Sequence, residues 1–85
     1  MSESVIIVYA SEWCGDCRRA RRILNEHQIP YEWINIDRDK QAEQYVKTVN
    51  RGMRSVPTIV FPDGSILVEP SNAQLTEKLQ LIQES

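Results

Sequence analysis

Cys14 and Cys17 are the only cysteines in this chain of 85 residues, and Gly15 and Asp16 separate them. Two thiols at this spacing can close a small disulfide and open it again, which is the chemistry of thiol–disulfide exchange. The pair follows an apolar, strand-like run at residues 5–9 and precedes a helical pattern. Cys14 is therefore expected at a helix N-terminus, where unpaired backbone N–H groups and the helix dipole favour the reactive thiolate.

Two other uses of the cysteine pair stay open on the sequence alone. Both cysteines could be buried and unreactive, although their spacing and position favour redox chemistry. They could also supply half of a zinc or iron–sulfur site, since four ligands are usual and a second copy would have to complete the set. His27 is the one histidine that could add a ligand. We expect no metal, because thiol exchange needs none.

Composition narrows the class of protein. The length suits one small domain spanning residues 1–85, and two cysteines are too few for a disulfide-stapled scaffold. A net charge of −2 gives no electrostatic support for nucleic-acid binding. Residues 1–4 hold no basic side chain and the apolar run after them is short, so we expect neither a secretory signal nor a membrane contact. A reducing cytoplasm is the natural setting for such a chain, and we expect a monomer.

Hydrophobic spacing predicts seven elements. Apolar runs indicate strands at 5–9, 31–36, 58–61 and 66–68, with a hairpin turn joining the last two. Apolar residues at helical spacing indicate helices at about 15–27, from a cap at Asp37 or Asp39 to residue 50, and from a capping box that begins at Ser71. The first strand is apolar on both faces, as a strand covered on both sides would be.

The element order β-α-β-α-β-β-α predicts the fold. The first βαβ unit requires two parallel strands, and the hairpin adds an antiparallel pair to the same sheet. The expected architecture is α/β, with a four-stranded mixed sheet flanked by three helices on both faces. A C-x-x-C motif near a βαβ unit is a sequence sign of the thioredoxin-like fold.

Four local patterns resemble the glutaredoxin family, and within it the mycoredoxins, which work with mycothiol. They are Trp13-Cys14-Gly15-Asp16-Cys17, Ser55-Val56-Pro57-Thr58, Phe61-Pro62-Asp63-Gly64 and Glu69-Pro70-Ser71. The resemblance covers nearly the whole chain. Two features depart from most of that family: Gly15 and Asp16 replace a proline and an aromatic residue, and no Gly-Gly turn precedes the last helix.

The resemblance implies roles for the residues at these positions. Cys14 would be the nucleophile and Cys17 the resolving thiol. A cis peptide bond is implied between Val56 and Pro57, in a loop that would offer the Val56 backbone to a substrate; the alternative is a simple turn proline before a strand. Trp13 would give a substrate an apolar contact, or else cover the core.

Two further positions have a functional and a structural interpretation. Ser71 and Asn72 could bind the carboxylate of a small thiol through free N–H groups, or could simply cap the last helix. Asp16 suits the first turn of a helix, and its charge would also oppose a thiolate at Cys14.

The predicted function is thiol–disulfide oxidoreductase, acting on disulfide-bonded or S-thiolated proteins. No tightly bound cofactor is needed: a low-molecular-weight thiol, mycothiol or glutathione, would serve as co-substrate, or a flavin-dependent reductase would supply electrons directly. The alternatives are an electron donor coupled to thioredoxin reductase, similar to the hydrogen donors of ribonucleotide reductase, and a zinc or iron–sulfur module.

Overall fold

The computed structural model describes residues 5–84, which form four strands and three helices. In chain order the elements are β1 (Ile6–Ala10), α1 (Gly15–Glu26), β2 (Tyr31–Asn35), α2 (Lys40–Val49), β3 (Thr58–Val60), β4 (Ile66–Val68) and α3 (Asn72–Glu84). Among the described residues, no helix is both long enough and apolar enough to cross a membrane. The predicted order of elements is confirmed.

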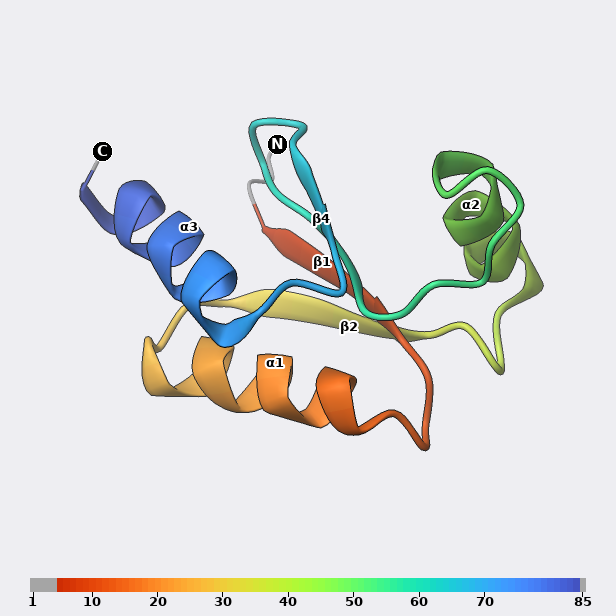
Figure 1. Ribbon diagram of the computed structural model, residues 1–85, viewed down its shortest axis with the longest axis horizontal. Helices are drawn as coiled ribbons and strands as arrows, with labels where there is room; N and C mark the ends of the chain where they lie inside the picture. The colour runs from red at the N-terminus through yellow and green to blue at the C-terminus, as the bar shows by residue number, and fades with distance from the viewer. Residues whose placement is uncertain (1–4, 85) are drawn as a thin grey trace.

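The four strands make one mixed sheet in the order β2-β1-β3-β4 (Figure 1). β1 runs parallel to β2, with Tyr9 opposite Ile34, and antiparallel to β3, with Tyr9 opposite Thr58. β3 and β4 form the antiparallel hairpin that the turn sequence predicted. This pairing places the carboxyl end of β1 beside the amino end of β3, so the segments that follow β1 and precede β3 meet at one edge of the sheet.

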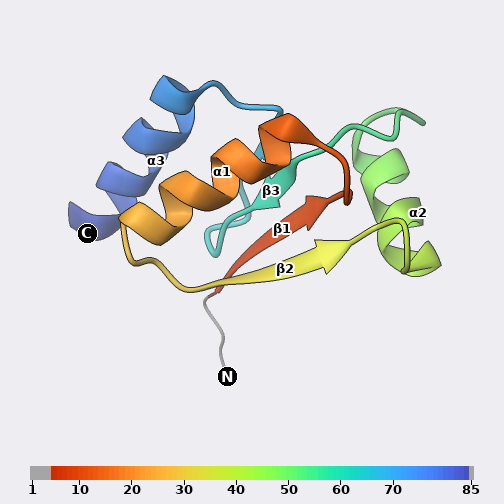
Figure 2. The same ribbon diagram turned by 90° about the horizontal axis from the view of Figure 1, so that it is seen from below.

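The helices cover the two faces of the sheet unequally. α1 and α3 lie side by side on one face, whereas α2 lies apart from them at the carboxyl ends of β1 and β2 (Figure 2). A small cluster of Ile36, Ala42 and Val46 holds α2 to the sheet, with Tyr9 and Ile34 packed against it. The ring of Tyr9 lies 5.0 Å from that of Tyr45, centroid to centroid.

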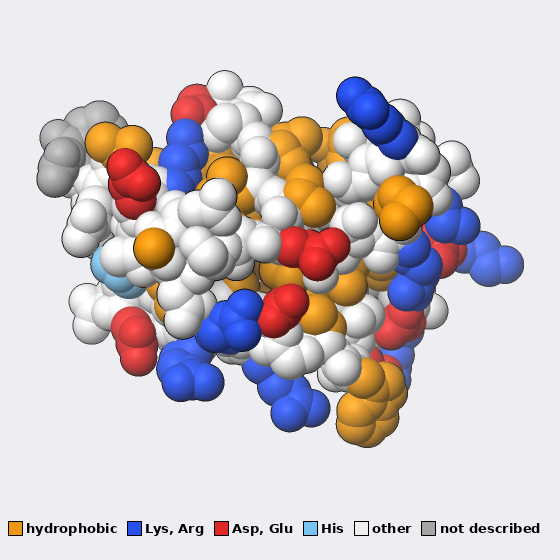
Figure 3. Space-filling model, in the orientation of Figure 1, with side chains coloured by type: hydrophobic (Ala, Val, Ile, Leu, Met, Phe, Trp, Pro, Cys, Tyr) orange, Lys and Arg blue, Asp and Glu red, His pale blue; other side chains and the backbone are white. Residues whose placement is uncertain are grey.

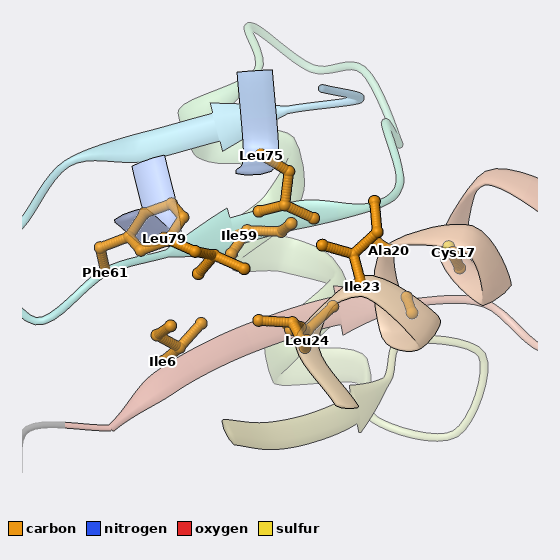
Figure 4. Packing of buried hydrophobic residues seen from close by; sticks show 11 residues of the cluster. Ile6, Cys17, Ala20, Ile23, Leu24, Ile59, Phe61, Leu75 and Leu79 are labelled. Carbon is orange, nitrogen blue, oxygen red and sulfur yellow. The ribbon is translucent and has the colours of Figure 1, made fainter. Parts of the chain in front are cut away.

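The main core lies between the sheet and the pair α1 and α3 (Figure 4). The strands β1 and β3 and the helices α1 and α3 each contribute the apolar residues that their spacing predicted, and these side chains pack together. The buried members are Ile6, Val8 and Ala10 from β1, Cys17, Ala20, Ile23 and Leu24 from α1, Ile59 and Phe61 from β3 and its end, and Leu75 and Leu79 from α3. α1, which carries both cysteines near its start, is therefore fixed by a row of buried side chains along its length.

Several predicted bounds were wrong by one residue. β1 begins at Ile6 and ends at Ala10, because Ala10 pairs with Asn35. Only one face of β1 is fully buried; Ile7 and Tyr9 on the other face are half-buried, because α2 covers that face only in part. The strands predicted at 31–36 and 58–61 and the helix predicted at 15–27 each end one residue earlier than expected.

Leu24→Ala and Leu81→Ala form a matched test of this core. Leu24 is fully buried in α1, whereas the Leu81 side chain in α3 is 57% exposed. We expect the substitution at Leu24 to lower the free energy of unfolding by about 2–5 kcal/mol and the one at Leu81 to change it by less than about 0.5 kcal/mol. Urea unfolding followed by circular dichroism measures both. Equal losses would contradict the packing described.

Candidate active site

Cys14 is the N-cap residue of α1. Its sulfur accepts a hydrogen bond from the backbone N–H of Cys17 at 3.2 Å, and its carbonyl accepts from the N–H of Arg18. The same sulfur lies 3.8 Å from the carbonyl oxygen of Val56, to which the thiol can donate. The sulfur thus sits at the positive end of the helix dipole and accepts one of the helix's unpaired N–H groups, an arrangement that stabilises negative charge on it.

Cys17 has a different environment, although it is only one turn away. Its side chain is 1% exposed and belongs to the main core. Burial, reinforced by the hydrogen bond with Cys14, raises the pKa of the Cys17 thiol to about 12, against a smaller opposing effect of the Ser11 backbone. Both cysteines are free thiols in this structure. At neutral pH Cys17 keeps its proton, and Cys14, which caps the helix, is the more accessible of the two thiols.

The loop before β3 completes the site. The peptide bond between Val56 and Pro57 is cis, as the resemblance to the glutaredoxins implied, and Pro57 is buried. Val56 packs against both hydrophobic clusters while its carbonyl faces the Cys14 sulfur. Within residues 5–84, no acceptor receives the Val56 N–H. A free backbone donor beside the thiol is what an extended substrate segment would need in order to pair there.

Trp13 stands out from the surface next to the thiol. Its side chain is 84% exposed, so the interpretation of Trp13 as a lid on the core is wrong. In Figure 3 a hydrophobic patch stands out at the lower right, over the loop between β1 and α1 of Figure 1. An aromatic ring that no other side chain covers is available for apolar contact with a partner.

Ser71 and Asn72 lie at the start of α3, and the predicted capping box is confirmed. The Ser71 hydroxyl oxygen accepts from the Gln74 N–H at 3.1 Å, and the Gln74 side-chain oxygen accepts from the Ser71 N–H at 2.8 Å. The first turn of α3 therefore satisfies two of its own N–H groups. Among the described residues, no hydrogen bond or ion pair links Ser71 or Asn72 to Cys14.

A charge network that the sequence did not reveal ties the loops around Cys14 together. The guanidinium of Arg54, just before the Val56 loop, donates to carboxylate oxygens of Asp37 and Glu43. Asp37 also accepts the backbone N–H of Glu12 at 3.3 Å, and the Glu12 carboxylate pairs with Arg38 at 3.3 Å. One carboxylate thus connects the loop that precedes Cys14 with the loop that faces it.

These partners were missed because they come from three separate segments of the chain. Arg54 is paired with two carboxylates that lie on other segments of the chain, and no sequence spacing relates it to them. Asp39, the other candidate cap, holds the N-terminus of α2 through the Ala42 N–H. The only sign of this network in the sequence was the position of Asp37, which lies between the end of β2 and the α2 cap Asp39 and does not cap the helix itself.

Asp16 and His27, the other polar residues that the sequence singled out on α1, have structural partners. Asp16 in the first turn of α1 forms an ion pair with Arg19 at 2.9 Å. His27 caps the far end of α1, and its ring nitrogen Nδ1 lies 3.3 Å from the side-chain oxygen of Gln83. In the part of the chain that the structure describes, no three His, Cys, Asp or Glu side chains are grouped to hold a metal ion.

The difference between the two thiols predicts selective alkylation. At pH 7 iodoacetamide should modify Cys14 more than about tenfold faster than Cys17, because Cys17 is buried and protonated. Mass spectrometry with fragment sequencing locates the adduct, and each cysteine→serine variant isolates one thiol. In urea the two rates should converge. Comparable rates in the folded protein would contradict the assignment.

The Arg54 network predicts a loss of stability in acid. Hydrogen bonds from Arg54 lower the pKa of both the Asp37 and the Glu43 carboxyl. Because these pKa values are lower in the folded than in the unfolded state, the stabilisation is present near neutral pH and is lost as the pH falls from about 5 to about 3.

Arg54→Gln should make this acid-side decline of the melting temperature shallower. Arg51→Gln is the matched control, because Arg51 lies in the same loop and has no ion pair with any described residue. The network would not contribute to stability if the Arg54→Gln and wild-type profiles ran parallel from pH 7 to pH 3.

Comparisons with known proteins agree with this geometry. The Glutaredoxin family profile matches residues 6–66. A Mycobacterium tuberculosis protein classed with the glutaredoxins is 37% identical over 79 residues, which are 93% of this chain and 94% of that protein. Mycoredoxin 1 of Corynebacterium glutamicum is 34% identical over 93% of this chain and 98% of its own. The crystal structure of a thioredoxin-like protein superposes with a TM-score of 0.74 at 26% identity, covering 93% of this chain and 94% of that one. The chain therefore belongs to the glutaredoxin family.

Proposed function

We propose that this protein is a thiol–disulfide oxidoreductase that reduces protein disulfides and mixed disulfides between proteins and small thiols. The observation that carries the proposal is the unequal environment of the two thiols. Cys14 caps a helix and is accessible, whereas Cys17 is buried one turn away with its pKa raised to about 12. One sulfur is suited to attack a partner and the other to act afterwards.

The reaction proceeds by two exchanges. The Cys14 thiolate attacks one sulfur of the substrate disulfide; a bond forms between them, the substrate S–S bond breaks, and the departing sulfur leaves as a thiolate that takes up a proton. The mixed disulfide is then resolved in one of two ways. A small thiol attacks the sulfur bonded to Cys14, forms a disulfide with it and frees Cys14 as the thiolate. Alternatively, Cys17 attacks the Cys14 sulfur, the second product leaves as a thiol, and the low-molecular-weight thiol or a reductase reduces the resulting Cys14–Cys17 disulfide.

Burial is the largest cause of the raised pKa of Cys17, and the hydrogen bond and charge of Cys14 add to it. When Cys14 is in the mixed disulfide its sulfur is no longer a thiolate, so its charge no longer opposes loss of the Cys17 proton.

Substrate contacts are available on both sides of Cys14. The free Val56 N–H can pair with a substrate carbonyl, in the manner of an added strand, and the exposed ring of Trp13 can cover an apolar side chain of the partner. Pro57 holds this loop against the core.

The reductant we favour is mycothiol, with glutathione second. The similarity to mycoredoxin 1 supports this order. The capping box at Ser71 supports it as well, because it occupies N–H groups that the sequence had offered to the carboxylate of a small thiol. Asn72 remains a candidate contact for the reductant at the first turn of α3. This chemistry requires a reducing compartment, and we place the protein in the cytoplasm.

The test is the reduction of a protein that carries a small-thiol mixed disulfide, with mycothiol and glutathione supplied separately. We expect wild type to turn over, Cys14→Ser to fall to the uncatalysed rate, and Cys17→Ser to retain activity, because the small thiol can resolve the mixed disulfide. On a substrate with an internal disulfide, Cys17→Ser should instead accumulate as an adduct at Cys14, detected by mass spectrometry.

Other outcomes would redirect the assignment. Activity of Cys14→Ser equal to wild type would contradict the proposed nucleophile. Turnover with thioredoxin reductase and NADPH but with neither small thiol would favour a dedicated electron donor. Absence of all turnover, with zinc or iron bound between two chains, would favour a metal module.

A further inference from the structure

Glu69 occupies an unusual backbone position beside the candidate site. It follows β4 and precedes Pro70, and its φ of 48° lies in the left-handed region. Two other residues that are not glycine share this region, Gln28 and Arg51, and both follow the end of a helix, where a left-handed residue commonly terminates the helix. Glu69 has no such role, and glycine or asparagine would adopt this conformation at lower cost.

The backbone of Glu69 is anchored to the loop that faces the thiol. Its N–H donates to the carbonyl of Pro57 at 2.9 Å. The carbonyl of the preceding residue, Val56, lies 3.8 Å from the Cys14 sulfur. The turn after β4 accordingly runs beside the start of β3 (Figure 1). Glu69 is exposed, and its backbone is hydrogen-bonded to the residue that follows Val56, which places it at the rim of the site.

Among the described carboxylates that the site loops carry, Glu69 has a charge that no arginine pairs with. Each of the other carboxylates around the site has a basic partner: Glu12 has Arg38, Asp16 has Arg19, and Asp37 and Glu43 share Arg54. Glu69 has no ion pair with any residue between 5 and 84. Its negative charge therefore acts on whatever approaches Cys14 from this side.

We propose that Glu69 is a specificity-determining residue that disfavours thiols and disulfides carrying carboxylates and favours uncharged or cationic ones. This inference rests on the proposed function and narrows its co-substrate class. The physical basis is repulsion between like charges, which is largest at low ionic strength and is screened as the Debye length shrinks. The left-handed backbone of Glu69 costs conformational energy, and such a cost is typical of residues at functional sites.

The experiment is a single turnover of the pre-reduced protein with three small symmetrical disulfides that differ in charge. They are bis(2-hydroxyethyl) disulfide, which is uncharged, 3,3′-dithiodipropionate, which is anionic, and cystamine, which is cationic. Each reaction consumes one disulfide, oxidises Cys14 and Cys17 to their disulfide, and releases two small thiols, which are quantified by chromatography. No other reductant or oxidant is needed.

Glu69→Gln should raise the rate constant for the anionic disulfide relative to the uncharged one by about threefold at 20 mM salt and lower that for the cationic one by a similar factor. The difference should nearly vanish at 500 mM salt. Glu69→Asp should behave like wild type, and so should Glu26→Gln, an exposed glutamate at the far end of α1. For each variant, the rate constant for a charged disulfide is divided by that for the uncharged one, which removes any general change in thiol reactivity. Comparing this ratio between variants removes the intrinsic reactivity of the disulfides.

Each result decides one of the two claims. Unchanged ratios in Glu69→Gln, with normal reaction of the uncharged disulfide, would overturn the specificity role and leave the proposed function standing. A changed ratio that persists at 500 mM salt would indicate a steric effect and would also overturn it. Failure of wild type to react with all three disulfides would contradict the proposed function and, with it, this inference.

Discussion

The sulfur of Cys14 serves as the cap of a helix, and the rest of the site depends on that hydrogen bond. An N-cap normally uses an oxygen of serine, threonine, aspartate or asparagine to accept an N–H of the first turn. Here a sulfur accepts the Cys17 N–H, so the group that stabilises the helix start is also the thiol that we propose as the nucleophile. The interaction strengthens when the sulfur is ionised, since a charged acceptor forms a stronger hydrogen bond than a neutral one.

The sheet topology explains why the loop of Cys14 meets the correct neighbours. Antiparallel pairing of Tyr9 with Thr58 puts the end of β1 beside the start of β3, which brings the Val56 carbonyl to the Cys14 sulfur. Parallel pairing of β1 with β2 puts the carboxyl ends of both strands at the same edge, so Asp37 also arrives there. There the Asp37 carboxylate accepts hydrogen bonds from the Glu12 backbone N–H and from the Arg54 guanidinium, and so holds the loops on both sides of the site.

Local patterns in the sequence predicted the parts of the fold that depend on neighbours in the chain. The helix stripes, the hairpin turn and the capping box at Ser71 each have a fixed spacing, and all three are present. The cysteine pair was recognisable for the same reason. Bounds moved by a residue because strand ends are set by the partner strand, as at Ala10 and Asn35.

Features set by tertiary contacts gave no comparable signal. Arg54 lies 17 residues from Asp37 and 11 from Glu43, and no spacing rule relates three charges on separate segments. The left-handed turn at Glu69 was hidden because the residue is neither glycine nor asparagine. Whether Trp13 covers the core or faces solvent depends on tertiary packing, and no local spacing predicts its 84% exposure.

A chain of this size has little core to spare, and the site therefore uses residues that also hold the fold together. Cys17 is a member of the main core, and Val56 packs against both hydrophobic clusters at the place where they meet. The same valine presents its carbonyl to Cys14. Because packed interiors resist small displacements, a loop fixed by two clusters holds its backbone at a set distance from the sulfur without a disulfide or a metal. The rim groups, Trp13 and Glu69, lie outside these clusters. Partner preference can therefore change at the rim while the thiol geometry stays fixed by the core.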